Sequence, residues 1–155
     1  MAPTIRPVTE TDLPQLHQLI CALAAHHGDT PNVNPNQLRK DVIGPSPWYR
    51  VLVAEAGSKG LIGYAALLPL GQLQSSAKGM DMHHLFVRPS ARGTGVGRAL
   101  VAACHDLCRT LGCSLMTVGT HPDNHAAAQF YETRGFVPRL PSGPRFAISL
   151  DQPLT

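Results

Sequence analysis

The sequence has few charged residues, few aromatic residues and no long hydrophobic run. Charged residues make up 15% of the 155 positions and aromatic residues 5%, whereas disordered chains combine high charge with low hydrophobicity. Hydrophobic residues reach 43%, enough for a packed core. The longest apolar runs, such as Ala65 to Leu68, are too short to cross a bilayer, and the first residues lack the apolar core of a signal peptide. We therefore expect a single domain over residues 1–155 and no membrane partner.

Positive charge is also modest. The net charge is +3 with histidine neutral, from 13 Lys and Arg against 10 Asp and Glu, and the basic residues are scattered along the chain. A nucleic-acid-binding surface needs a concentrated basic patch or stripe, so we expect no nucleic-acid partner.

The four cysteines form no CxxC pair, because they stand at positions 21, 104, 108 and 113. His105 adjoins Cys104, but adjacent residues of a helix point about 100° apart and make a poor pair of metal ligands. We expect reduced thiols, no metal site and a cytoplasmic location.

Hydrophobic periodicity and turn residues predict an α/β fold with a mixed sheet and helices on both faces. The expected order is β-α-α-β-β-β-α-β-α-β-β. Strands are predicted at 5–8, 48–55, 61–68, 80–87, 114–120, 136–140 and 146–150. Helices are predicted from the capping-box-like residues 9–12 to Gly28, and at 36–43, 95–111 and 124–134, and residues 70–78 are predicted to be a loop.

The most informative stretch is a glycine run between the fourth predicted strand and a long helix. Gly93, Gly95 and Gly97 alternate there, with Arg92 and Arg98 beside them. Glycines let the backbone approach a ligand, and the N–H groups at a helix start bind anionic oxygens, so the run predicts a phosphate or pyrophosphate site.

Three other interpretations of the glycine run compete with a site of this kind. A Walker A loop needs Gly-Lys-Ser/Thr, but Arg98 and Ala99 follow Gly97. A dinucleotide fingerprint needs GxGxxG, whereas the spacing here is GxGxG. The run can also be a turn that only starts a helix.

A second motif begins at Asn124 and includes Tyr131. The two residues are seven positions apart, so on a helix they share one face about 10 Å apart. An amide at the helix start can bind a polar part of a cofactor, and a phenol two turns later can reach a sulfur. The alternatives are a helix N-cap for Asn124 and a core aromatic for Tyr131.

The two motifs together resemble the GCN5-related N-acetyltransferases (GNAT). The segment Arg92 to Gly97 resembles the family's Arg/Gln-x-x-Gly-x-Gly/Ala motif. The segment Asn124 to Phe136 is similar to its second cofactor segment, with an Asn, a Phe-Tyr pair and a closing Gly-Phe. Residues 5–7, 47–55, 63–65 and 85–89 look most like the diamine (spermidine/spermine-type) branch.

The resemblance implies acetyl-CoA as cofactor, a small-molecule amine as acceptor, direct attack in a ternary complex, splayed central strands and a homodimer. It implies that Tyr131 protonates the leaving thiolate, a role that suits a phenol of pKa about 10. It also implies a set of cofactor-binding residues: Leu85, Phe86 and Val87 for the pantetheine, Arg92, Gly93, Thr94, Gly95, Val96, Gly97 and Arg98 for the pyrophosphate, and Asn124 and Tyr131.

The chain departs from the diamine branch at His83 and His84, where those enzymes carry Glu-Asp. An imidazole does not attract a polycation, but it can take a proton from an ammonium near neutral pH. Adjacent strand residues point to opposite faces, so we expect only one of the two in the acceptor pocket, and the match to the acidic position selects His83. The alternatives are a packing role for both histidines, with the proton leaving through water held by backbone carbonyls.

Four function classes remain at this stage. The preferred one is a small-molecule N-acetyltransferase. A peptide or protein N-acetyltransferase, a non-catalytic acyl-CoA binding or sensing domain, and an unrelated nucleotide-binding module stay open. The sequence carries no readable code for the identity of the amine.

Overall fold

The computed structural model describes residues 2–141 and 143–155, which form two compact units. The first unit ends at Gly119 and holds the whole sheet, whereas the second runs from Thr120 to Thr155.

The first unit is built on a five-stranded mixed sheet in the order β1-β2-β3-β4-β5. The strands β1 to β4 are antiparallel neighbours, and β5 runs parallel to β4. The strand bounds are β1 Thr4–Pro7, β2 Arg50–Glu55, β3 Leu61–Gln72, β4 Ala77–Val87 and β5 Leu115–Val118.

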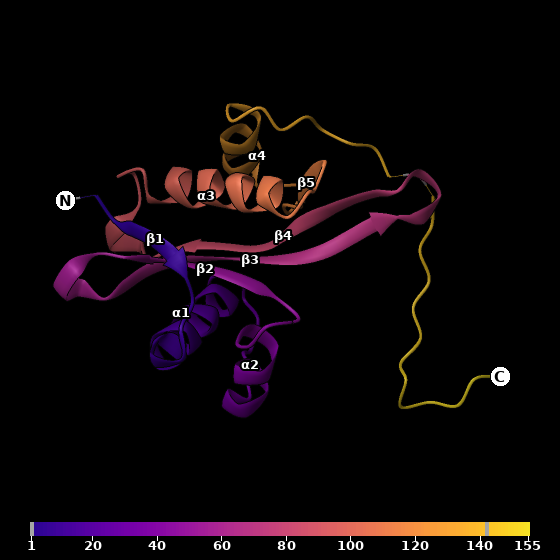
Figure 1. Ribbon diagram of the computed structural model, residues 1–155, viewed down its shortest axis with the longest axis horizontal. Helices are drawn as coiled ribbons and strands as arrows, with labels where there is room; N and C mark the ends of the chain where they lie inside the picture. Colours follow the sequence, from indigo (N-terminus) through magenta and orange to yellow (C-terminus); the bar gives the residue numbers. More distant parts are fainter. Residues whose placement is uncertain (1, 142) are drawn as a thin grey trace. The chain divides into compact units, whose positions relative to one another are not determined.

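Helices cover both faces of this sheet. In Figure 1, α1 (Leu13–His26) and α2 (Pro35–Val42) lie on one face, and α3 (Val96–Thr110) lies on the other. The helix α4 (His125–Glu132) belongs to the second unit. The expected α/β class, with a mixed sheet and helices on both faces, is therefore confirmed.

The two hydrophobic layers follow the alternation of the strands. On the α1–α2 face, alternate strand residues such as Val53, Tyr64 and Phe86 pack in one buried cluster with Leu16 and Leu19 of α1. On the other face, α3 buries a stripe at helical spacing: Val96, Leu100, Cys104 and Cys108. Gly63 lies under this helix, because a Cβ there would lie 3.4 Å from the Leu100 side chain.

A β-bulge interrupts the pairing of β3 with β4. Ala66 pairs with His84 and the next residue, Leu67, pairs with Met82, so His83 is an extra residue on β4. Met82 consequently shares the α3 face with Leu67, while His84 shares the opposite face with Ala66. The period-2 pattern of β4 changes register at His83.

The pairing of β4 with β5 is short. It runs from Gly79 opposite Leu115 to Met82 opposite Val118. In the part of the chain that the structure describes, β5 pairs with β4 no further, although β4 continues to Val87. The two strands thus separate at the bulge, in agreement with the expected splay.

Two sequence predictions about strands are wrong. The expected loop at 70–78 is the end of a hairpin, because β3 continues to Gln72 and β4 begins at Ala77, with a single 3₁₀ turn between them. The expected strands at 136–140 and 146–150 are absent from the described residues of these segments. A strand needs a neighbouring strand for its backbone hydrogen bonds, and alternating side chains alone do not supply one.

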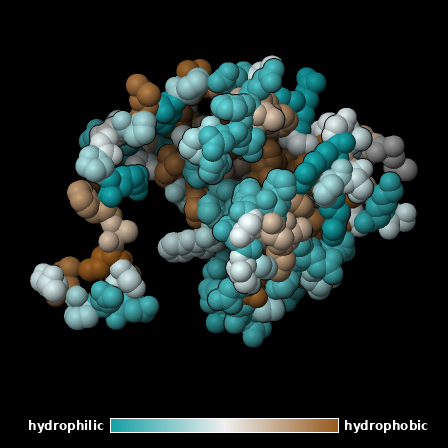
Figure 2. Space-filling model, turned by 180° about the vertical axis from the view of Figure 1, so that it is seen from behind, coloured by the Kyte–Doolittle hydropathy of each residue, from teal (hydrophilic) through white to brown (hydrophobic). Residues whose placement is uncertain are grey.

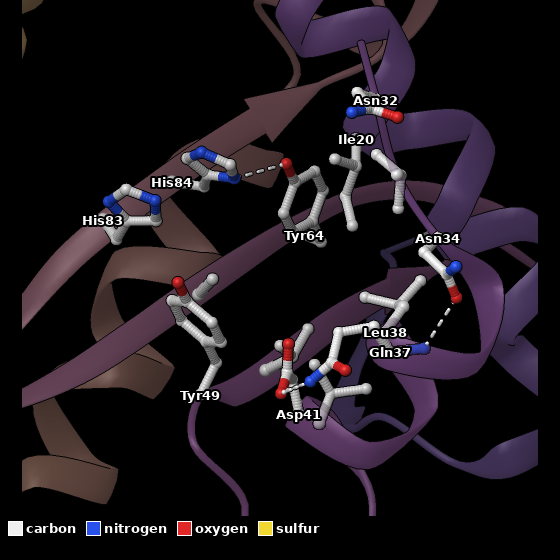
Figure 3. Close-up of a pocket in the computed structure, with 14 residues that line it drawn as sticks. Ile20, Asn32, Asn34, Gln37, Leu38, Asp41, Tyr49, Tyr64, His83 and His84 are labelled. Atoms are coloured by element: carbon white, nitrogen blue, oxygen red, sulfur yellow. Dashed lines mark hydrogen bonds between the residues drawn. The ribbon is translucent and has the colours of Figure 1, made fainter. Parts of the chain in front are cut away.

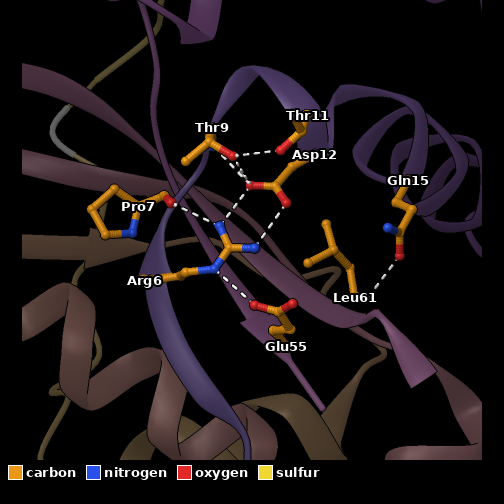
Figure 4. Close-up of polar contacts among 8 residues, drawn as sticks. All are labelled: Arg6, Pro7, Thr9, Thr11, Asp12, Gln15, Glu55 and Leu61. Carbon is orange, nitrogen blue, oxygen red and sulfur yellow. Dashed lines mark hydrogen bonds and ion pairs between the residues drawn. The ribbon is translucent and has the colours of Figure 1, made fainter. Parts of the chain in front are cut away.

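An ion-pair cluster ties the start of the chain to the sheet (Figure 4). The Arg6 guanidinium donates two hydrogen bonds to Asp12, at 2.7 and 2.8 Å, and its Nε donates to Glu55 at 2.9 Å. The backbone N–H and the hydroxyl of Thr9 also donate to Asp12. These contacts hold the pKa of the buried Asp12 carboxyl at about 2, below its ordinary 3.8, chiefly through Arg6.

We expect Asp12→Asn to lower the free energy of unfolding by about 2 kcal/mol at pH 7. Because the pKa of Asp12 is depressed in the folded state, this stabilisation is full above about pH 4 and is lost as the pH falls toward about 2. Urea titrations of both proteins over this range measure it. Glu10→Gln is the matched control, since its partner Arg39 is exposed. A difference between wild type and Asp12→Asn that does not shrink at low pH would contradict the assignment.

Candidate functional site

A pocket of about 300 Å³ opens on the α1–α2 face of the first unit (Figure 3). Its apolar lining comes from both helices, the loop between them and the sheet: Ile20, Val33, Leu38, Val42, Val51 and Ala66. Its polar lining is Asn32, Asn34, Gln37, Asp41, Tyr49, Tyr64, His83 and His84. The pocket therefore combines an apolar body with polar groups, as small-molecule sites do.

Both histidines of β4 line this pocket, so the expectation that only one would face it is wrong. The physical reason is the bulge, since an extra residue removes the strict alternation of side chains. The two imidazole rings stack, with centroids 4.3 Å apart and planes 15° apart. His83 is exposed and His84 is half-buried.

Tyr64 of β3 holds His84 in place through a hydrogen bond. Its hydroxyl oxygen lies 2.9 Å from His84 Nδ1, the hydrogen bond drawn in Figure 3. Burial lowers the pKa of His84 to about 4, and the neighbouring His83 and His27 add to this. Burial also raises the pKa of the Tyr64 phenol. Near neutral pH, His84 is thus an uncharged imidazole that is hydrogen-bonded to the uncharged phenol of Tyr64.

Asp41 of α2 gives the pocket its charge. Among the described residues that line the pocket it is the one acid, and none is Lys or Arg. Gln37 donates to Asp41 Oδ1 at 2.9 Å, and the backbone N–H of Tyr49 donates to the backbone carbonyl of Asp41 at 2.9 Å. The Tyr49 ring in turn lies near-parallel to His83, with centroids 5.7 Å apart. This arrangement favours a cationic ligand between Asp41 and His83.

The residues predicted to bind the pantetheine follow the two histidines directly on β4. Phe86 is buried in the α1–α2 cluster, and Leu85 and Val87 are half-buried. This part of β4 lies beyond the last residue that pairs with β5, so the structure brings the histidine pair and the splayed segment together on one strand.

The glycine run forms a turn at the end of the same strand. Gly93 and Gly95 have φ of 75° and 93°, and a Cβ at either would meet nothing within 4 Å. Gly95 is the N-cap of α3, whose first-turn N–H groups at Val96, Gly97 and Arg98 have no acceptor within the helix. These donors and the open space beside them fit a pyrophosphate, because such N–H groups bind anionic oxygens.

The arginine and threonine of the turn support its shape. Arg92 Nε donates to the Val87 carbonyl at 2.8 Å, and its guanidinium lies 5.5 Å from the Phe86 ring centroid. The Thr94 hydroxyl donates to the Ala91 carbonyl at 2.6 Å. Arg98 is exposed on the first turn of α3. The turn is therefore fastened to the end of β4.

The second motif lies in the second unit. Asn124 caps α4, since its Oδ1 accepts from the Ala127 N–H at 3.1 Å, so the N-cap interpretation is confirmed. Tyr131 lies near the end of the same helix, with the rings of Phe130 and Phe136 at 5.2 and 5.4 Å. The expected helical spacing of Asn124 and Tyr131 thus holds within this unit.

Sequence reasoning did not find Asp41 or Tyr64, and it set His84 aside. No local signal marks Asp41, which lies on a polar helix and enters the pocket through the packing of α2. The signal for Tyr64 was its place on a predicted strand at alternate spacing with Ala66. The bulge that lets His83 and His84 both line the pocket has no signature in the sequence.

Comparisons with known proteins agree with this geometry. Residues 16–136 match the Acetyltransferase (GNAT) family. The chain therefore belongs to this family, whose members use acetyl-CoA as co-substrate. The predicted resemblance is confirmed at the level of the family.

The identity to individual relatives is low. The chain is 26% identical to a thialysine N-epsilon-acetyltransferase of Bos taurus over 140 residues, which covers 84% of this chain and 82% of the relative. It is 29% identical to an IAA acetyltransferase of Azospirillum brasilense over 127 residues, covering 82% and 80%. A solved aminoglycoside acetyltransferase from an uncultured soil metagenomic sample superposes with a TM-score of 0.79 at 19% identity, covering 95% and 97% of the two chains. This last likeness supports the fold alone.

No helix in residues 2–141 and 143–155 is long and apolar enough to cross a membrane. The same residues contain no group of three or more His, Cys, Asp or Glu side chains that could hold a metal ion.

Proposed function

We propose that the protein is an N-acetyltransferase that moves the acetyl group of acetyl-CoA to a primary amine of a small molecule, by direct attack in a ternary complex. One observation carries the proposal. A single strand, β4, presents a pocket suited to a cation at His83 and His84, continues at 85–87 beyond its last pair with β5, and leads into the glycine turn at 92–98.

The residues that would hold acetyl-CoA are those of the splayed segment and the turn. The backbone of Leu85, Phe86 and Val87 would pair with the pantetheine, and the N–H groups of residues 92–98 would bind the pyrophosphate. Asn124 and Tyr131 complete the set on the strength of the family motif. When bound, the thioester supplies an activated acetyl group.

The acceptor amine would bind in the pocket. The Asp41 carboxylate attracts the ammonium form, and the aromatic face of the half-buried Tyr49 suits a cation as well. His83 takes one proton from the ammonium, which frees the nitrogen lone pair for attack on the carbonyl carbon. Tyr131 supplies a proton to the sulfur that leaves. The C–S bond breaks as the C–N bond forms.

The experiment that tests this function is a screen of amines of matched length with detection of the released thiol. We expect acetylation of 1,4-diaminobutane and butylamine, and slower acetylation of 4-aminobutanoate, whose carboxylate Asp41 repels. Tyr131→Phe removes only a hydroxyl, so we expect turnover to fall roughly 10²–10⁴-fold while acetyl-CoA affinity is kept.

His105→Ala, on the exposed part of α3, is the control for this screen. Mass spectrometry of each product identifies the acetylated nitrogen. The proposal fails if no amine of a broad panel is acetylated while acetyl-CoA still binds, an outcome that favours an acyl-CoA sensor. Loss of acetyl-CoA affinity in Tyr131→Phe would make the hydroxyl a binding group instead.

The glycine turn has its own test. We expect Gly95→Val to abolish acetyl-CoA binding measured by calorimetry, because φ of 93° disfavours a side chain and a valine would fill the open space beside the turn. Gly28→Val is matched for strain, since Gly28 has φ of 76° and no neighbour within 4 Å, but it follows α1. Equal affinity in both variants, with native-like circular dichroism, would refute the pyrophosphate site.

We also propose a homodimer, with residues 1–155 of each copy acting as a single cytoplasmic domain. The C-terminal segment supports the dimer, because Phe146, Leu150 and Leu154 are 92%, 94% and 87% exposed. Hydrophobic residues of this kind appear brown in Figure 2. Exposed apolar side chains in such number mark a surface that another chain covers.

Light scattering of the full chain is expected to give twice the mass of one chain. The triple variant Phe146→Ser, Ile148→Ser, Leu150→Ser should shift it to a monomer, because it removes the alternating apolar side chains. Val137→Ser, outside this row, is the comparison variant. A monomeric full chain at micromolar concentration would reject the dimer.

A further inference from the structure

The His83 imidazole stacks on the imidazole of its neighbour in the same strand, His84. The His83 ring is exposed, yet two other rings stack against it. The ring centroid of His84 lies 4.3 Å from that of His83, and the ring centroid of Tyr49 lies 5.7 Å from it. An exposed histidine on a strand ordinarily samples several rotamers. Here the neighbouring ring of the same strand restricts it.

His84 can restrict its neighbour because it is itself held. Tyr64 is 1% exposed and fixed in the core cluster. Its hydroxyl is 2.9 Å from His84 Nδ1, and its ring meets the His84 ring edge-on at 5.9 Å between centroids. A chain of contacts therefore runs from the core through Tyr64 and His84 to the exposed His83, as Figure 3 shows.

We propose that His84 is a positioning residue: anchored by Tyr64, its ring holds the His83 ring at the pocket in the orientation that takes the proton from the acceptor ammonium. The proposal deepens the proposed function and rests on it. The proton moves from the ammonium nitrogen to an imidazole nitrogen of His83 and later to water, so His84 gains and loses none.

The charges around the pair fit this division of roles. His84 is neutral near pH 7, because burial lowers its pKa to about 4, so it places no positive charge beside His83 when His83 accepts a proton. Other titratable groups face the pair from the packed elements. They are Asp41 from α2, Tyr49 before β2, Tyr64 from β3, Cys21 from α1, and His27, which caps the end of α1. Asp41 is the one carboxylate among them, and it favours a cation in the pocket.

Three variants separate the contribution of the stacked His84 ring from that of its hydrogen bond to Tyr64. His84→Ala removes the stacked ring, His84→Phe restores a planar ring without nitrogen, and Tyr64→Phe removes only the anchoring hydroxyl. We expect His84→Ala to lower kcat about 10–100-fold with the KM for acetyl-CoA unchanged, since misplacement of a reacting group costs rate rather than binding. His84→Phe should recover most of kcat, and Tyr64→Phe should lie between.

The pH profile distinguishes positioning from direct proton transfer. The acidic limb of kcat/KM should persist in all three variants and disappear in His83→Ala, because His83 is the proposed proton acceptor. If the limb instead disappears in His84→Ala and persists in His83→Ala, His84 is itself the base and the proposal is overturned. Equal impairment of His84→Phe and His84→Ala would also overturn it.

A measurement without substrate keeps the test independent of turnover. In the wild-type protein, NMR should show close contacts between the ring protons of His83 and His84, and His83 should show a single rotamer. Both signatures should be lost in His84→Ala and weakened in Tyr64→Phe, with His105→Ala as the control. Unchanged His83 signals in both variants would refute positioning, whereas a wild type that orders His83 but acetylates no amine would refute only the proposed function.

Discussion

The extra residue at His83 is the constraint on which the site depends. Without it, strict alternation would carry Met82 and His84 to one face, and either a core methionine or a site histidine would lie on the wrong side of the sheet. With it, Met82 packs toward α3, and His83 and His84 both reach the pocket. The pairing with β5 stops at the same point, at Met82. One local irregularity therefore brings both histidines to the pocket at the point where the pairing of β4 with β5 ends.

Charge is distributed in two separate ways around this point. The Arg6, Asp12 and Glu55 cluster is internally satisfied and fixes β1 against β2 and the start of α1. In the pocket, by contrast, Asp41 has no ion-pair partner among the described residues. Gln37 donates an amide N–H to the Asp41 carboxylate, which leaves its negative charge unneutralised.

The sequence predicted features that are local and missed those that need distant pairing. The glycine turn, α3 and the capped helix α4 follow from residues close together in the chain, and their positions agree with the structure within a few residues. Asp41 and Tyr64 could not be found in this way, because α2 and β3 meet only in the folded unit. The bulge was also not predicted, since it is defined by the pairing of β4 with β3, which the order of residues in β4 alone does not specify.

The C-terminal segment shows the limit of the same reasoning. Phe146, Ile148 and Leu150 alternate as in a half-buried strand, so the pattern specifies an apolar face but not the strand that pairs with it. The described residues of this segment contain no strand, and the three side chains are exposed. Side chains in this pattern contribute to stability only if another surface buries them. The wrong strand prediction and the proposed dimer therefore have the same origin, the alternating apolar side chains of residues 146–150. The prediction assumed that a strand of the same chain buries them, and the proposal assigns their burial to a second copy.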